Sequence, residues 1–317
     1  MLLDIKPIEN DRDYADGIAI RNSDLDHMPL TVEEARSFDA ANPSDLYFER
    51  QLGRDPDGVA LAYGMVRQER AQEGKLFMAD VMVSDLRVLE AWHQMRHSVE
   101  QRCRDLDATT TISFTRSDRP SIAKAMEDHG YALSQTNPVS CLDVQTFCAE
   151  PFQARVAKAE ADGFKLLSLG EYARQVGERW KEVYWRFVMD VLQDVPMPVP
   201  FVEEPLDEFV KWVETRNWDL ETRYVALDGD RMAAVSEFEV RKADPRIGST
   251  YLTGARREYR RRGLATALKA KALAHAKSMG LERLYTDNEE SNPMYVLNLE
   301  LGFKHAFDWL IYKKEAN

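Results

Sequence analysis

Residues 251–268 read YLTGARREYRRRGLATAL, a β-like run that ends in a basic turn and leads into a helix starting at a glycine. The first turn of a helix leaves backbone N–H groups without intrahelical partners, at the positive end of the helix dipole. An anion placed there is bonded by several amides at once. Gly263 and Ala265 let phosphate oxygens approach the backbone, and the arginines at 260–262 add charge. The pattern predicts a diphosphate site, although a basic loop capping an amphipathic helix would look similar.

A second block of residues follows this stretch. It comprises Tyr285–Asn288, Asn292–Met294, Asn298 and Leu301–Phe303. Together the two blocks resemble the GNAT superfamily of N-acetyltransferases, whose signature (Q/R)-x-x-G-x-(G/A) lies between the fourth strand and the following helix. Arg260, Gly263 and Ala265 match that signature. The resemblance covers the C-terminal half of the chain. The tandem arrangement also resembles, distantly, that of mycothiol synthase-type proteins.

The resemblance implies a fold and a coenzyme site. It implies an α/β (α+β) chain of two tandem GNAT-like domains, each with a mixed, mostly antiparallel central sheet flanked by helices. The fourth and fifth strands of such a domain separate, and the pantetheine arm of acetyl-CoA lies between them. The residues that would contact the coenzyme are Leu252, Thr253, Ala255, Arg260, Arg261, Arg262, Gly263, Leu264, Ala265, Thr266, Asn288 and Asn292. An acceptor amine would attack the thioester directly in a ternary complex.

The chemistry requires proton transfers. A primary amine with a pKa of about 10 must lose a proton before it attacks. Glu237 and Glu239, two residues apart on one face of a strand, are candidate bases, directly or through water, although solvated strand carboxylates would look the same. A backbone N–H near Leu252 is a candidate donor to the oxyanion. Many family members protonate the leaving thiolate with a tyrosine at the position of Asn298; Tyr295, one turn earlier, could substitute or could simply pack.

The acceptor pocket of the family lies between the early helices and the strand opening. Residues of that region are Trp180, Tyr184, Trp185, Asp190, Asp194, Glu203 and Glu204. An aromatic and acidic wall would suit a cationic acceptor. Core aromatics combined with solvated acids are the alternative interpretation.

The first half of the chain repeats the order of elements seen in the second half, and Gly130-Tyr131 parallels Gly302-Phe303. We therefore expect a tandem duplication, with a degenerate domain at 1–152 and an acetyl-CoA-binding domain at 153–317. The segment at 83–91 stands where the diphosphate loop would be, and it contains no glycine and two acids. This half is expected to bind coenzyme A weakly or not at all; a second active site on a divergent loop is the alternative.

Local patterns predict several elements of the second half. Asp228-Gly229-Asp230 lies between two β-like runs and predicts a hairpin. Apolar residues at helical spacing predict one helix over 172–187, and four prolines predict a loop over 194–205. The charged, alanine-rich segment at 147–162 is interpreted as the linker.

Composition limits the classes of partner. The net charge of −12 argues against nucleic acid. No apolar run is long enough for a membrane span, and the first residues lack a signal-peptide core, so we expect a cytoplasmic protein. His93 and His97 have metal-type spacing without a third ligand, and no metal is expected. The sequence leaves monomer and homodimer open.

The leading hypothesis is an acetyl-CoA-dependent N-acetyltransferase that acts on a small amine-bearing acceptor through its C-terminal domain. One alternative is a non-catalytic acyl-CoA sensor or scaffold of the same fold. Another is acyl transfer to a non-amine acceptor.

Overall fold

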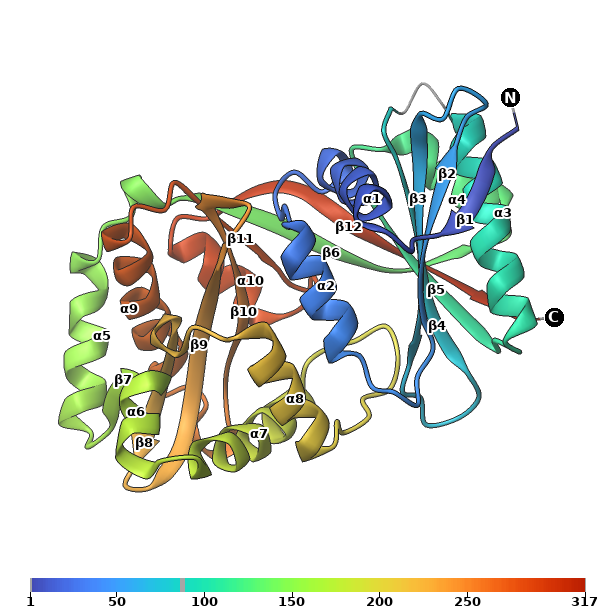
Figure 1. Cartoon of the computed structure of the whole chain (residues 1–317). Helices are drawn as coiled ribbons and strands as arrows, with labels where there is room; N and C mark the ends of the chain where they lie inside the picture. The colour runs from blue at the N-terminus through green and yellow to red at the C-terminus, as the bar shows by residue number, and fades with distance from the viewer. Residues whose placement is uncertain (1, 86–88, 317) are drawn as a thin grey trace. The chain divides into compact units, whose positions relative to one another are not determined.

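The computed structural model describes residues 2–85 and 89–316. The chain forms two compact units (Figure 1). The first unit comprises Met1–Asn137, Met197–Val202 and Phe307–Asn317, and the second comprises Pro138–Pro196 and Glu203–Ala306. In both units the sheet is mixed, mostly antiparallel and flanked by helices, which confirms the predicted fold class.

The sheet of the first unit has the strand order β1-β2-β3-β4-β5-β12. Only β4 and β5 run parallel among the pairs of this unit that the structure describes. Helix α3 packs on the face that carries Ala62, and α1 packs on the opposite face, beside Tyr63. The elements are β1 (Asp4–Pro7), α1 (Asp11–Asp24), α2 (Val32–Ala41), β2 (Phe48–Arg54), β3 (Ala60–Glu69), β4 (Leu76–Val83), α3 (Leu89–Asp105), β5 (Thr110–Arg116), α4 (Pro120–Asp128) and β12 (Lys304–Glu315).

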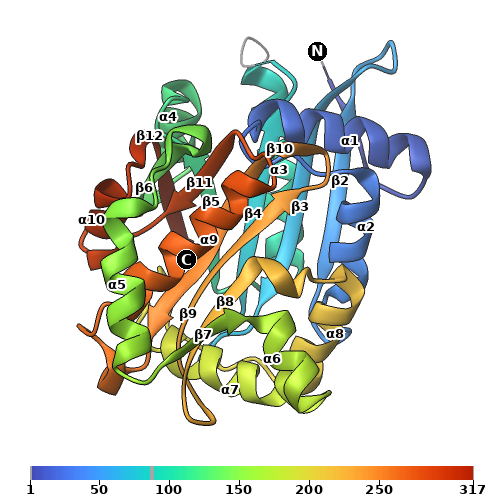
Figure 2. The same ribbon diagram turned by 90° about the vertical axis from the view of Figure 1, so that its left-hand side faces the viewer.

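The sheet of the second unit has the order β6-β11-β10-β9-β8-β7, and β10 and β11 are parallel. Helices α9 and α5 cover one face (Figure 2), while α6, α7 and α8 pack on the other. The elements are β6 (Ala132–Asp143), α5 (Glu150–Ala161), β7 (Lys165–Ser168), α6 (Leu169–Val176), α7 (Arg179–Leu192), α8 (Leu206–Arg216), β8 (Arg223–Asp228), β9 (Arg231–Arg241), β10 (Asp244–Ala255), α9 (Leu264–Ser278), β11 (Arg283–Asp287) and α10 (Pro293–Glu300). Short 3-10 helices are Val144–Thr146, Leu220–Thr222 and Arg257–Tyr259.

The two units exchange their last strands. Strand β6 follows the helices of the first unit but pairs with β11 of the second, from Val139 to Asp143. Strand β12 ends the chain but pairs with β5 of the first unit, from Trp309 to Glu315. The sequence predicts one boundary near residue 152, whereas the units of the structure are discontinuous in sequence. Each sheet is completed by a strand from the other repeat.

Several local predictions meet the structure directly. The hairpin around Gly229 is confirmed as β8 and β9. The single helix expected over 172–187 is wrong, because Gly177 has a φ of 61° and separates α6 from α7. The segment read as a linker contains α5, and β2 was not anticipated. The sequence of β2 does not show the usual alternation of apolar and polar residues, because the charged Arg50 is buried in it and pairs with Asp39.

None of the helices in the described ranges is both long and apolar enough to cross a membrane.

The strand exchange predicts where a C-terminal mutation acts. Tyr312 on β12 is 2% exposed and belongs to the core of the first unit, so Tyr312→Ala should destabilise that unit by about 3–5 kcal/mol. Hydrogen exchange should then accelerate in β5 and α4. The matched control is Phe303→Ala, also 2% exposed, which lies in the core of the second unit and should accelerate exchange there. Faster hydrogen exchange in the second unit after Tyr312→Ala would contradict the assignment of β12 to the first unit.

Candidate functional site

Strands β10 and β11 pair along only part of their length. The parallel ladder joins Ile247–Ser249 to Arg283–Tyr285. Past this point β10 continues to Ala255 and β11 continues to Asp287. The two strands therefore separate in the second unit, as the family resemblance implies. The edge of β10 that faces β11 lacks its ladder partner beyond Ser249.

A β-bulge lies in β10 where the separation begins. The register with β9 jumps between Thr250 and Thr253. Within the bulge, the N–H of Leu252 donates to Oε1 of Glu237 at 3.2 Å instead of to a β9 carbonyl. A bulge bends its strand and increases the local twist. This one bends β10 away from β11.

The turn after β10 presents the start of α9. Gly263 precedes the helix with a φ of 80°, a left-handed conformation that glycine adopts at little cost. In the described part of the chain, no side chain caps this helix, and its first turn carries no acidic residue. The first amides of α9 therefore have no side-chain partner, and an anion could take them.

A cavity of about 600 Å³ joins the end of β10 to the start of α9. Nine residues predicted to bind the coenzyme line it, namely Thr253, Ala255, Arg260, Arg261, Gly263, Leu264, Ala265, Thr266 and Asn292. Residues that line it without having been predicted as coenzyme contacts include Arg155, Val191, Asp194, Gly254, Tyr259 and Met294. Arg155 comes from α5, the helix that the sequence analysis took for a linker.

Three predicted coenzyme contacts do not line this cavity. Leu252 is held at the bulge by Glu237. The guanidinium of Arg262 lies over the ring of Phe164, 4.6 Å from its centroid. Asn288 accepts a hydrogen bond from Asn298.

Asp194 neutralises part of the basic turn. Its carboxylate pairs with Arg257 and Arg260, and it also lines the cavity. Hydrogen bonds from these two guanidinium groups hold the pKa of Asp194 below its usual range. The sequence analysis assigned Asp194 to the acceptor region, whereas the structure places it against the turn that carries the glycine signature.

The two candidate bases point to the same face of β9, and both are paired with arginines. Glu237 is 6% exposed and lies 3.1 Å from Nε of Arg223. It also accepts a 3.0 Å hydrogen bond from the hydroxyl of Tyr184. Burial raises the pKa of this tyrosine well above its ordinary value. The carboxylate of Glu239 is more accessible, with 22% of its side chain exposed, and pairs with Arg216 at 2.9 Å. Neither carboxylate lines the cavity, and Glu239 is the more exposed of the two.

The candidate acid residues lie away from the cavity lining. Asn298 is fully buried, and its amide donates to Oδ1 of Asn288 at 2.5 Å. Tyr295 does not appear among the lining residues, although Asn292 at the start of the same helix does. The structure therefore brings Asn292 to the cavity and leaves Asn298 and Tyr295 outside it.

The aromatic and acidic residues assigned to an acceptor wall have other roles. Trp180 and Tyr184 belong to the core between α7 and the sheet. Trp185 donates its indole N–H to the carbonyl of Glu204 at 2.8 Å. Asp190 pairs with Arg256. These contacts favour the alternative of core aromatics and paired acids over an acceptor wall.

The first unit has the same strand separation but fills it. Strands β4 and β5 pair only as far as Met78 and Ile112, although both continue. Beyond that point, Oδ1 of Asp80 accepts from the N–H of Phe114 at 3.1 Å. The pKa of Asp80 is raised, mainly because the carboxyl group is buried.

Arg96 completes this internal filling from α3. Its guanidinium donates to the carbonyl of Ala79 at 2.7 Å and to the hydroxyl of Ser113 at 2.9 Å. It is 1% exposed. Two backbone groups beside the gap, the N–H of Phe114 and the carbonyl of Ala79, are thus bonded by side chains of the same unit. Part of the expected divergent loop, residues 86–88, lies outside the described residues.

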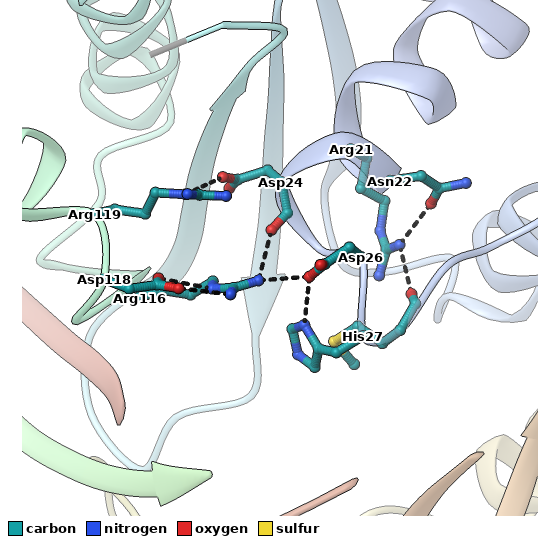
Figure 3. Close-up of polar contacts among 9 residues, drawn as sticks. Arg21, Asn22, Asp24, Asp26, His27, Arg116, Asp118 and Arg119 are labelled. Atoms are coloured by element: carbon teal, nitrogen blue, oxygen red, sulfur yellow. Dashed lines mark hydrogen bonds and ion pairs between the residues drawn. The ribbon is translucent and has the colours of Figure 1, made fainter. Parts of the chain in front are cut away.

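Ion pairs also surround the end of β5 (Figure 3). Arg116 pairs with Asp26 and Asp118, each at 2.7 Å, and Arg119 pairs with Asp24 at 3.3 Å. These pairs tie the loop after α1 to the end of β5. The cations there are engaged by neighbouring acids.

His93 and His97 line a second cavity of about 620 Å³, beside α3. Nδ1 of His93 lies 3.0 Å from Nε2 of His129, so the two rings share a hydrogen bond. Within residues 2–85 and 89–316, no three His, Cys, Asp or Glu side chains are placed to hold a metal ion.

Comparisons with known proteins bear on both units. Residues 185–303 match the model of the acetyltransferase (GNAT) family, and no curated protein matches the chain significantly. The chain is similar to a tandem GNAT protein from the clavulanic acid biosynthesis pathway, with a TM-score of 0.72 and 18% identity over 99% of each chain. It is also similar to a GCN5-related N-acetyltransferase from Sphaerobacter thermophilus, with a TM-score of 0.70 and 17% identity over 99% of this chain and 95% of that one.

A third similar structure belongs to a longer protein. It is the GCN5-related glucosamine N-acetyltransferase region of a fungal multi-domain GH3 β-N-acetylglucosaminidase, with a TM-score of 0.71 and 14% identity. The match covers 98% of this chain and 38% of that chain, so this chain spans less than half of that protein. Likenesses at such identities show a shared fold. A link to mycothiol synthase-type proteins stays a prediction.

The filled gap of the first unit predicts the effect of two substitutions. Asp80→Ala removes the acceptor of the Phe114 N–H, and leaving that buried donor unpaired should cost about 1–3 kcal/mol. Asp80→Asn keeps an acceptor oxygen and should cost less. Thermal unfolding, together with hydrogen exchange at Phe114, measures both. Equal stability of the Ala and Asn variants would show that the hydrogen bond does not hold the gap closed.

Proposed function

We propose that the chain is a tandem member of the GNAT superfamily of acyltransferases and that its second unit transfers the acetyl group of acetyl-CoA to an amine of a small acceptor. The supporting observation is a single cavity that runs from the separated edge of β10 to the uncapped start of α9. Such a cavity suits a ligand with an extended amide-bearing arm and linked phosphates. Members of the GNAT family generally use acetyl-CoA, which has this construction.

The diphosphate of the coenzyme would bind at the start of α9. Gly263 and Ala265 leave the backbone accessible, and the amides from Arg261 to Thr266 provide donors. Arg260 supplies a guanidinium for bidentate contact with phosphate. The pantetheine arm would lie along the unpaired edge of β10, beside Thr253.

Transfer joins the acceptor nitrogen to the thioester carbonyl carbon, breaks the carbon–sulfur bond, and releases one proton. Glu239 is the base that we propose, directly or through water, because its carboxylate is accessible and lies one strand position beyond Glu237 on the same face. Glu237 holds the bulge through Leu252 and acts as a positioning residue.

The leaving thiolate needs little help. A thiol has a pKa of about 8.5, so its anion is a tolerable leaving group near neutral pH. Tyr295 and Asn298 are outside the cavity lining, and the proposal assigns no proton to either. Asn292 lines the cavity from the side of α10 and would contact the coenzyme there.

Two alanines of α9 provide a matched test of the coenzyme site. Ala265 lies in the first turn and lines the cavity, so Ala265→Trp should cover the amides and weaken acetyl-CoA binding more than about tenfold. Ala274 is exposed near the other end of the helix, so Ala274→Trp should leave affinity unchanged. Isothermal titration calorimetry measures both. Equal affinities would reject the assignment of the turn.

Asp194 offers a test in the opposite direction. Its carboxylate occupies Arg257 and Arg260 and adds negative charge to the cavity. Asp194→Asn should therefore tighten acetyl-CoA binding about two- to fivefold, and the gain should shrink at high salt. Titrations at low and high ionic strength measure this effect. Weaker binding by the variant would mean that Asp194 orders the turn for the ligand.

Turnover is tested separately from binding. Release of free thiol from acetyl-CoA is followed with a library of amines. Thiol release that depends on an amine supports transfer. Binding of acetyl-CoA without release by any amine would instead favour a sensor, or a non-amine acceptor.

A further inference from the structure

Three charged side chains follow one another on the face of β9 opposite α9. Glu237, Glu239 and Arg241 alternate with residues that point to the helix α9 side. The first pairs with Arg223 and the second with Arg216. The third, Arg241, forms no ion pair with any carboxylate in the part of the chain that the structure describes.

Arg241 is a buried cation with unmet bonding capacity. It is 3% exposed. Its guanidinium donates to the hydroxyl of Ser249 at 2.7 Å and to the hydroxyl of Tyr251 at 3.3 Å, and its Nε–H is buried without a partner. A buried charge is costly unless it is paired, and two neutral hydroxyls do not neutralise it.

Among residues 2–85 and 89–316, no carboxylate lies within ion-pair distance of Arg241. Glu239 is the nearest carboxylate on its strand, and it already accepts two hydrogen bonds from Arg216, at 2.9 and 3.3 Å. The group therefore contains two guanidinium cations and one carboxylate, within a chain whose net charge is −12. Arg246, near the start of β10, differs from Arg241 because it is exposed and pairs with Asp244. An anion beside Arg241 would restore the balance.

Arg241 lies near the bulge of β10 and near Glu239, the proposed base. Tyr251 bonds Arg241 and immediately precedes Leu252, the residue in the β10 bulge. Glu239 and Arg241 are two residues apart on one face of a strand, which corresponds to about 6–7 Å. A ligand lying along this face could place one end at Glu239 and the other at Arg241.

We infer that Arg241, with Ser249 and Tyr251, binds a carboxylate of the acceptor, so that the substrate is an amine which also carries a carboxylate several bonds from its nitrogen. This inference rests on the proposed function, because the amine end is placed at Glu239. It assigns Arg241 a role in substrate specificity and leaves the coenzyme site unchanged. A bidentate guanidinium–carboxylate pair gives both charge and orientation.

The test uses ω-amino acids from glycine to 6-aminohexanoate, each compared with its own amide. Thiol release from acetyl-CoA is measured with the full-length protein at saturating coenzyme. The carboxylate members of suitable length should have kcat/KM values at least about tenfold above those of their amides, the factor expected for a charged hydrogen-bonded pair. Amides that react as well as the acids would overturn the inference while leaving the acetyltransferase proposal standing.

Variants locate the effect at Arg241. Arg241→Gln should raise KM for the carboxylate acceptors at least about tenfold and abolish the preference over amides. Its affinity for acetyl-CoA, measured by titration, should be unchanged. The control Arg246→Gln should behave as the wild type. An unchanged KM in Arg241→Gln would overturn the assignment.

Two further outcomes are decisive. If Arg241→Gln does not fold, Arg241→Lys retains the charge, and it should keep a reduced preference for acids; full loss or full retention of the preference would contradict a bidentate role. If acetyl-CoA binds but no amine in either series or in the wider library releases thiol, the proposed function fails, and this inference fails with it.

Discussion

The hydrogen bond from the amide of Leu252 to the carboxylate of Glu237 is the constraint on which the second unit depends. It replaces a backbone bond of the ladder and thereby fixes the bulge in β10. The carboxylate is itself held by Arg223 and Tyr184, so the bulge is braced from the interior of the unit. Because β10 bends here, it leaves β11, and the cavity opens toward α9. Tyr251, which immediately precedes Leu252, accepts a hydrogen bond from Arg241.

The two units give different solutions to one structural problem. Separating parallel strands leaves backbone groups without partners, and buried groups of this kind must be bonded. The first unit satisfies them with Asp80 and Arg96. The second unit has no comparable pair in the described residues that line its gap, and its helix α9 begins at an uncapped glycine. Residues inside the protein thus do in one unit what a ligand is proposed to do in the other.

Sequence reasoning succeeded where local pattern and local structure coincide. The strand, turn and helix around Gly263 follow directly from the residues. Nine of the residues named there line one cavity, and their contact with a coenzyme stays a prediction. It failed where a distant partner decides the outcome. Arg50 in β2 is buried with Asp39 and Tyr63 as partners, and Asp194 joins the basic turn from a loop far along the chain. The available signals were charged residues inside apolar segments.

Those signals were visible at Asp80, in the apolar run of β4, and at Arg241, at the end of a strand that is buried over most of its length. A charged residue in an apolar strand indicates that it has a partner, but the sequence does not show which residue or ligand that partner is. The exchange of β6 and β12 was harder to foresee, because a strand shows the same alternation of side chains whichever neighbour it pairs with. Pairing partners are a property of the whole chain.

The exchanged strands also set an order of events during synthesis on the ribosome. Domains of a nascent chain usually fold in sequence, the N-terminal one first. Here the sheet of the first unit needs residues 309–315, which are made only after the segments that form the second unit. Until they emerge, β5 presents an open edge, which is a template for unwanted pairing with other chains. Such a chain relies on chaperones to shelter the edge of β5 until β12 has been made.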